Sequence, residues 1–256
     1  MTRSSTKPAE VSEIHTRLLR LSLAVEESRA YWENVDPSLP PEARPDRAFE
    51  ERWFGAKSMA RVKLTLANMV VRFDAYPDAL EVLKAWRGMD RPTRTMICHW
   101  HLQLADPLYR RFSGHYLHDR RTLGSGDIDK SRAAAWIRDQ GEGRWAPSTT
   151  NRFANALLNA AKEAGLVAAG KDPRALTLPH VPDPALAYLL QLLRGIRFEG
   201  QLVDNPYLRS VGLYGETLDH RLHRLSGLTY HRLGNVADLE WAAPDLRSWA
   251  ATEATP

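Results

Sequence analysis

The sequence predicts a mainly α-helical protein, a helical bundle with winged helix-turn-helix modules that carry short β-hairpins. Apolar residues recur at helical spacing through most of the 256 residues. Twice along the chain, a helical stretch is followed by a glycine and then by two short strand-like segments joined by a turn. Hydrophobic residues make up 43% of the chain and include eight tryptophans, which is enough to form sizeable cores.

The first such unit lies within residues 124–182 and has the chain order of a winged helix-turn-helix. We expect residues 124–127 to be a flexible lead into a helix over Asp129–Gln140. A second helix is expected to begin at Ser148, whose hydroxyl can cap it, and to end at Gly165. Residues 166–168 and 175–178, joined by a turn over 170–173, then form a β-hairpin.

The second helix has an apolar side and a polar side that suits a polyanion. At about 100° per residue, the polar side carries hydroxyl, amide and cationic groups and no carboxylate. Asn can pair with adenine, Arg with guanine, and Ser with a phosphate oxygen. On the hairpin, Lys171 and Arg174 are placed to contact the adjacent backbone. The alternatives are a solvated face and a protein–protein module. The apolar side is formed by Phe153, Leu157, Ala160, Ala161 and Ala164, and the polar side by Ser148, Asn151, Arg152, Asn155, Asn159 and Lys162.

The N-terminal part repeats this pattern in a helix over Lys57–Phe73. Its apolar residues (62, 66, 69, 70 and 73) have the same spacing, offset by 91 positions, which places Arg61 on Arg152 and Asn68 on Asn159. Residues 52–72 hold five basic residues and no acidic one, so a second DNA contact through Lys57, Arg61 and Lys63 is a hypothesis.

Before this helix, residues 11–35 have a helical pattern with a possible break near Ser22, and the four prolines of residues 36–46 predict a loop.

The rest of the chain is expected to be helical except for one more hairpin. Helices are predicted over 78–87, 93–104, 107–118 and 184–193, with Asp106-Pro107 as a start signal. A helix over 217–226 precedes strands over 228–233 and 236–241, which flank Gly234-Asn235, and a helix over 245–250 ends the chain. The expected units are a helix-turn-helix-like part (11–76), a connecting bundle (77–123), the winged unit (124–182) and a C-terminal unit (183–256) packed on the rest.

Composition narrows the classes of function. The single cysteine, Cys98, excludes an internal disulfide and a cysteine-rich zinc site. The net charge of +4 is mild and does not establish nucleic-acid binding. His99, His101, His115 and His118 lack acidic or cysteine partners at ligand spacing, so they are expected to be interface or half-buried residues. The N-terminus lacks the apolar core of a signal peptide, and residues 185–193 are too short to cross a bilayer. We expect a cytoplasmic protein with no metal, cofactor or catalytic site.

Several motifs together resemble the BrxA family of accessory proteins in BREX bacteriophage-resistance systems. They are SLAVEESRAYW (22–32), the Arg/Lys-rich helix, the bundle, WxxSTTxR with EAGL (145–166), and a closing LxxW (246–249). The resemblance implies winged-helix ends around a NusB-like helical core, double-stranded DNA binding and no enzymatic activity. It also implies work beside larger BREX partners, such as the methyltransferase and the ATPase.

The sequence therefore predicts a non-catalytic, DNA-binding component of antiviral defence. Two alternatives remain, a protein–protein adaptor within the defence complex and a winged-helix transcriptional regulator. The predicted DNA-contacting residues are Ser148, Asn151, Arg152, Asn155, Lys171, Arg174, Lys57, Arg61 and Lys63.

Overall fold

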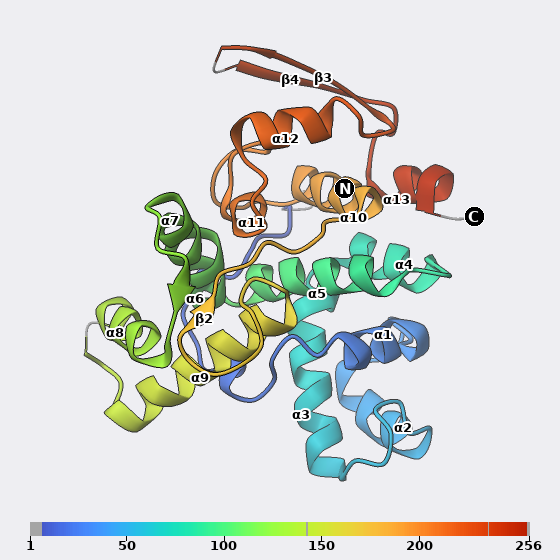
Figure 1. Ribbon diagram of the computed structural model, residues 1–256. Helices are drawn as coiled ribbons and strands as arrows, with labels where there is room; N and C mark the ends of the chain where they lie inside the picture. The colour runs from blue at the N-terminus through green and yellow to red at the C-terminus, as the bar shows by residue number, and fades with distance from the viewer. Residues whose placement is uncertain (1–6, 142, 235, 255–256) are drawn as a thin grey trace.

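The computed structural model describes residues 7–141, 143–234 and 236–254 and is mainly helical, as predicted. Helix α5 (Arg91–Ala105) runs through the middle of the molecule, with α1–α3 on one side and α10–α13 on the other (Figure 1). From Met96 onward every residue of α5 is buried, because helices surround it. Among the described residues, no helix is both long and apolar enough to cross a membrane.

The N-terminal segment corrects two predictions. Only α1 (Val25–Asn34) and a single 3-10 turn (Arg17–Leu19) are helical within residues 11–35; the rest is an irregular strap across the bundle. The loop predicted over 36–46 already contains a 3-10 turn (Pro41–Ala43) and the start of α2 (Arg44–Glu50). Proline is tolerated there because it lies in the first turn of α2, where the missing N–H costs nothing. The predicted cationic helix is present as α3 (Met59–Met69), continued by a π-helical turn (Val70–Asp74).

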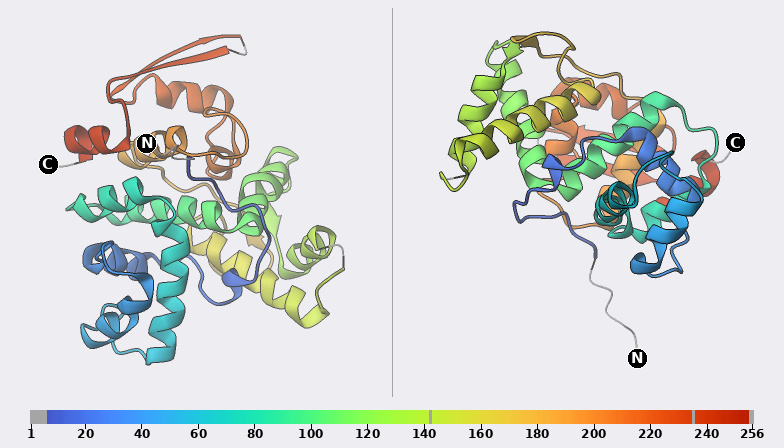
Figure 2. Two further views of the ribbon diagram at one scale, coloured as in Figure 1. Left: turned by 180° about the vertical axis from the view of Figure 1, so that it is seen from behind. Right: turned by 90° about the horizontal axis from the view of Figure 1, so that it is seen from below.

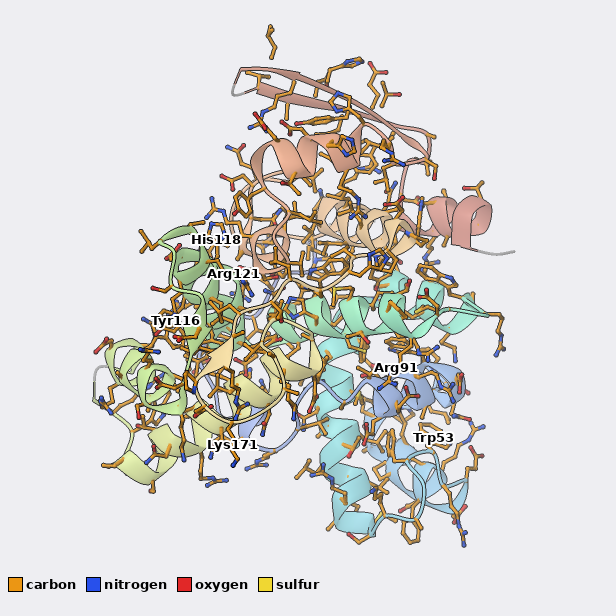
Figure 3. The ribbon with its side chains drawn as sticks, in the orientation of Figure 1. Trp53, Arg91, Tyr116, His118, Arg121 and Lys171 are labelled. Carbon is orange, nitrogen blue, oxygen red and sulfur yellow. The ribbon has the colours of Figure 1, made fainter. Side chains whose placement is uncertain are left out.

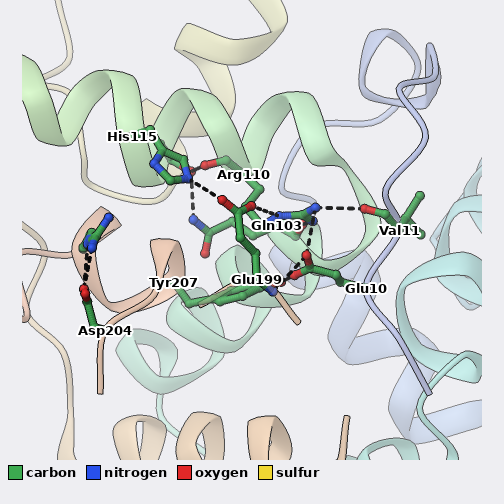
Figure 4. A network of polar contacts seen from close by, with 10 residues as sticks. Glu10, Val11, Gln103, Arg110, His115, Glu199, Asp204 and Tyr207 are labelled. Atoms are coloured by element: carbon green, nitrogen blue, oxygen red, sulfur yellow. Dashed lines mark hydrogen bonds and ion pairs between the residues drawn. The ribbon is translucent and has the colours of Figure 1, made fainter. Parts of the chain in front are cut away.

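The strap (residues 7–23) is fastened at both ends. Near its start, Glu10 accepts hydrogen bonds from Tyr207 Oη and from the backbone of Glu199, and pairs with Arg110 at 3.2 Å (Figure 4). Near its end, Arg72 donates to the carbonyls of residues 21, 22 and 23 at 2.6–3.1 Å. These long-range bonds explain why the segment is not a helix: its backbone polar groups are satisfied by the bundle instead.

The helices predicted between residues 77 and 123 are present, except that a π-helical turn interrupts the last of them. Asp90 and Asp106 cap α5 and α6, each accepting from the backbone N–H three residues on. The elements are α4 (Pro77–Ala85), α5, α6 (Pro107–Arg111), a π-helical turn (Phe112–Tyr116) and α7 (Leu117–Thr122).

Two helices follow in the predicted order, but the strands beside them differ from the hairpin predicted over residues 166–168 and 175–178. The helices are α8 (Lys130–Gln140) and α9 (Pro147–Glu163). After α9 the chain turns back on itself through an antiparallel bridge between Val167 and Leu176. The returning strand β2 (Arg174–Ala175) pairs with β1 (Asp127–Ile128), which lies just before α8. The sequence did not predict β1; the flexible lead proposed over 124–127 ends inside it.

The C-terminal unit packs on α4 and α5 through α10 and α13. Its antiparallel hairpin β3–β4 has the predicted strand limits and lies across α12, at the outer edge of the described chain (Figures 1 and 2). The structure adds one helix, α11, that the sequence did not predict. The elements are α10 (Asp183–Gly195), α11 (Pro206–Ser210), α12 (Gly215–Leu222), β3 (Leu228–Leu233), β4 (Val236–Trp241), α13 (Leu246–Trp249) and a π-helical turn (Ala250–Ala254).

Candidate nucleic-acid interface

The apolar side of α9 anchors the helix in the core. All five residues of the predicted stripe are buried. At the start of the helix, the ring of Trp145 lies 4.7 Å from that of Phe153. Gly141 makes room for it: a Cβ at this position would lie 2.6 Å from the Trp145 ring. The turn between α8 and α9 is therefore closed by an aromatic contact that sets how α9 leaves the bundle.

The beginning of α9 differs from the prediction. Ser148 does not cap the helix; Pro147 is its first residue, Ala146 occupies the cap position, and no side chain accepts a hydrogen bond there. Pro147 fits because its fixed φ suits the first helical position. The Ser148 hydroxyl is exposed and makes no hydrogen bond to any described residue, so it is free to meet a ligand.

The polar side of α9 is exposed along its length. Asn151, Arg152, Asn155, Asn159 and Lys162 all point to solvent. Within the described parts of the chain, none of their side chains takes part in a hydrogen bond or an ion pair. The polar side does contain one carboxylate, contrary to the prediction: Glu163, at the end of the helix, is exposed and accepts from the backbone N–H of Leu23 at 3.1 Å. A continuous, uncommitted strip of amides and cations remains.

The two hairpin cations have different surroundings. Lys171 is exposed at the tip of the turn that follows α9, and no described residue pairs with it (Figure 3). Arg174 is half-buried and its Nε lies 2.9 Å from Asp172. The same carboxylate accepts from the backbone N–H of Lys130 at 3.0 Å, which ties the hairpin to the start of α8. Arg174 therefore holds the hairpin in place and has less charge to offer a phosphate than Lys171.

Helix α3 offers a weaker surface than its spacing suggested. Lys57 and Lys63 are exposed, but Arg61 donates to the carbonyl of Arg20 at 3.2 Å. Asn68, expected on its outer side, and Arg72, counted among its five basic residues, are both buried, which corrects the prediction. Asn68 is 6% exposed and donates back to Leu64 O, and Arg72 is 3% exposed and bound to the strap.

The strap connects α3 with α9. Its 3-10 turn packs on α9, Leu23 bonds to Glu163, and Arg20 bonds to Arg61. Between them lies an open cleft of about 870 Å³ with mixed charge. Its charged lining residues are Glu26, Glu27, Arg61, Arg91 and Glu163. Three carboxylates beside two arginines make this cleft less suitable for a phosphate backbone than the strip on α9.

Three further cations near α9 were not among the predicted DNA-contacting residues. Arg144 lies over the ring of Trp145, 4.5 Å from its centroid, and is exposed next to the start of α9. Arg17 and Arg20 are exposed on the strap segment that packs on α9. Arg144 was detectable as the neighbour of the motif tryptophan, whereas Arg17 and Arg20 were assigned to a helix that does not form.

The central histidines are core residues, more deeply buried than predicted. His99 bonds to Tyr109 Oη and Ser210 Oγ, and His101 bonds to Arg72 O and Tyr188 Oη, at 2.7–2.9 Å. Burial lowers the pKa of His99 to about 3 and that of His101 to about 4, so both are neutral at pH 7. Over the described ranges, no three His, Cys, Asp or Glu side chains gather closely enough to hold a metal ion.

Comparison with known proteins identifies the family. The BrxA family model matches residues 13–192, which include α1, the bundle, α9 and most of α10. A solved structure, described as an uncharacterized protein from Magnetospirillum magneticum, shares the fold with a TM-score of 0.58 at 16% sequence identity. The match covers 78% of this chain and 98% of that one. No curated protein matches. The chain belongs to the BrxA family.

Proposed function

We propose that this protein is a non-catalytic component of a BREX phage-defence system and binds double-stranded DNA through α9. Membership of the BrxA family implies the defence role. The polar strip of α9, exposed and uncommitted to the rest of the described chain, carries the DNA-binding proposal. The order β1, α8, α9 and returning strand supports a winged helix-turn-helix in which α9 is the recognition helix.

Each predicted residue has a role that its surroundings support. Asn151 and Asn155 are placed to read adenine edges, and Arg152 to pair with guanine or phosphate. Ser148 and the start of α9 suit a phosphate, and so does Lys171 on the hairpin. Arg174 would act mainly by fixing the hairpin. Lys57, Arg61 and Lys63 of α3 would touch a second stretch of backbone more weakly.

The wider setting follows from the same proposal. The protein would work in the cytoplasm beside larger BREX subunits, such as the methyltransferase and the ATPase. Its helices α4–α7 and α10 would correspond to the NusB-like core of the family. No catalytic group is needed for this role.

Salt dependence tests the proposal directly. Affinity for a 20-base-pair duplex is measured by fluorescence anisotropy at several salt concentrations between 50 and 200 mM. Each phosphate contact contributes about 0.9 to the slope of log affinity against log salt, so Arg152→Ala with Lys171→Ala should reduce it by about 1.8. Arg224→Ala, an exposed arginine on the far unit, is the matched control and should leave it unchanged. An unaltered slope in the double variant, or no duplex binding by the wild type, overturns the proposal.

A protein–protein adaptor is the second candidate, and one observation favours it. At the tip of the β3–β4 hairpin, Leu233 is 87% exposed and Val236 is 71% exposed. Exposed apolar side chains on a projecting hairpin are typical of partner contacts. Salt-insensitive binding to a BREX subunit, abolished by Leu233→Ser, would favour the adaptor. A transcriptional regulator would instead select one operator from a random DNA pool.

A further inference from the structure

A separate cavity opens between the end of α1 and the turn that joins α4 to α5. It measures about 550 Å³ including its open mouth. None of its lining residues belongs to α8, α9, the hairpin after α9 or α3. Any ligand held here would therefore not need the residues assigned to DNA.

The lining is strongly cationic. Four of its residues are basic and only one is acidic. Arg29 is shared between Glu26 and Glu33, 3.6 Å from each. Arg87 is exposed, and no described residue pairs with it. The basic residues are Arg29, Lys84, Arg87 and Arg94, and the acidic one is Glu33.

The position of Lys84 shows that this charge is poorly compensated. Its ammonium donates to the carbonyl of Val35, at the C-terminal, partially negative end of α1. No carboxylate of the described chain lies within ion-pair distance of this ammonium. Burial lowers the pKa of Lys84, and the nearby Arg87 and Arg47 lower it further, while Asp36 opposes them. A negative charge in the cavity would relieve this repulsion between like charges.

Two buried donors of the lining also lack acceptors. The indole of Trp32 is 2% exposed and packs edge-on against Phe73 at 5.3 Å, yet its Nε1–H meets no acceptor in the described chain. Arg94 Nε is likewise buried and unpartnered, although its other nitrogens contact Met89 O and Glu26. Buried N–H groups are almost always paired, so these two mark a place where an acceptor is missing. No lining residue has an unpartnered buried acceptor among the atoms described.

We propose that this cavity is a binding site for a small oxyanion, such as the phosphate group of a phosphorylated molecule. Arg87 at the mouth supplies the main charge-assisted hydrogen bonds. Lys84 and Arg94 supply positive charge at the wall, and Trp32 Nε1–H supplies a neutral donor. The site is distinct from the α9 strip in residues and position.

Nitrogen-15 labelling of the tryptophans gives a direct test on the full chain. The indole N–H signal of Trp32, assigned by its loss in Trp32→Phe, is followed while inorganic phosphate is added at constant ionic strength. A saturable shift is expected. Arg87→Ala should weaken binding about fivefold to tenfold, whereas Glu33→Gln, which removes the competing carboxylate, should tighten it about twofold to threefold.

Control variants make each outcome decisive. Arg87 and Glu33 are exposed, so their replacement leaves the core intact, and Arg224→Ala controls for loss of one surface charge. A shift that does not saturate, or that is the same in Arg87→Ala as in the wild type, overturns the proposal. Adding a short duplex in place of phosphate distinguishes the source. A Trp32 shift that Arg87→Ala weakens assigns the oxyanion to DNA, and no shift with DNA assigns it to a free small molecule.

Discussion

Helices α3 and α9 share the same apolar spacing but differ in what their polar sides do. In α9 the polar side is exposed from Asn151 to Lys162 and is not engaged by the rest of the described chain. In α3, Asn68 is buried against its own helix and Arg61 is bonded to the strap. A β-hairpin follows α9, whereas α3 continues into a π-helical turn in which Arg72 and Phe73 are buried.

This difference shows that the burial of one side of a helix and the exposure of its opposite side are separate properties, which a sequence pattern does not distinguish. Periodicity fixes which side of a helix enters the core, and it did so correctly for both helices. It does not say whether the opposite side faces water or a neighbouring segment. For α3 the neighbour is the strap, which lies far away in the sequence and covers part of the side predicted to be free.

The largest effect on stability is expected at Arg72, one of the five basic residues from which a cationic outer side was predicted. Arg72→Met should lower the free energy of unfolding by about 2–4 kcal/mol, because three strap carbonyls lose their donor. Urea unfolding at pH 7 measures it. Lys63→Met, on the exposed side of α3, which precedes the turn that holds Arg72, should change stability by less than about 0.5 kcal/mol. Equal stability of the two variants would place Arg72 on the surface after all.

The next largest effect is a difference between α9 and α3 in how much their cations contribute to duplex affinity. Arg152→Ala with Lys171→Ala should weaken duplex binding about 60-fold at 0.1 M salt, an order-of-magnitude figure for two lost phosphate contacts. Lys57→Ala with Lys63→Ala removes the same charge from the α3 side and should weaken it only a few-fold. Anisotropy titrations of both double variants measure the difference. Equal losses would mean that α3 and α9 contact DNA alike.

A smaller effect separates reading of bases from attraction to phosphate. Asn155→Ala should cost about 1–3 kcal/mol of discrimination against a substituted base at one position of the preferred site. The salt slope should not change, because no charge is removed. Competition between duplexes that differ at single base pairs gives the discrimination. If Asn155→Ala weakens all duplexes equally, the side chain does not read a base.

Much of the fold could be predicted because local signals agree with the final packing. The bundle helices, α9 and the β3–β4 strands were located from periodicity, caps and turn residues. The structure of residues 11–24 could not be predicted in this way. Their apolar spacing fits a helix, but it also fits a strap whose hydrogen bonds go to the bundle and to Arg72. For the candidate site, the strip on α9 followed from periodicity alone. The ion pair of Arg174 and the cavity beside Trp32 depend on residues that meet only in the folded chain.

The smallest predicted effect concerns the two serines at the helix starts, of which only Ser148 was expected to be a cap. Ser58 caps α3 by accepting from Arg61 N, at 3.4 Å, whereas Ser148 caps nothing. Ser58→Ala should therefore lower the free energy of unfolding by about 0.5–1 kcal/mol, and Ser148→Ala by less than about 0.5 kcal/mol. Thermal unfolding of both variants measures the difference. Only Ser148→Ala should weaken binding to DNA, because its hydroxyl faces the proposed groove while that of Ser58 is committed to its own helix. A serine that stabilises α9 without affecting DNA would reverse both assignments.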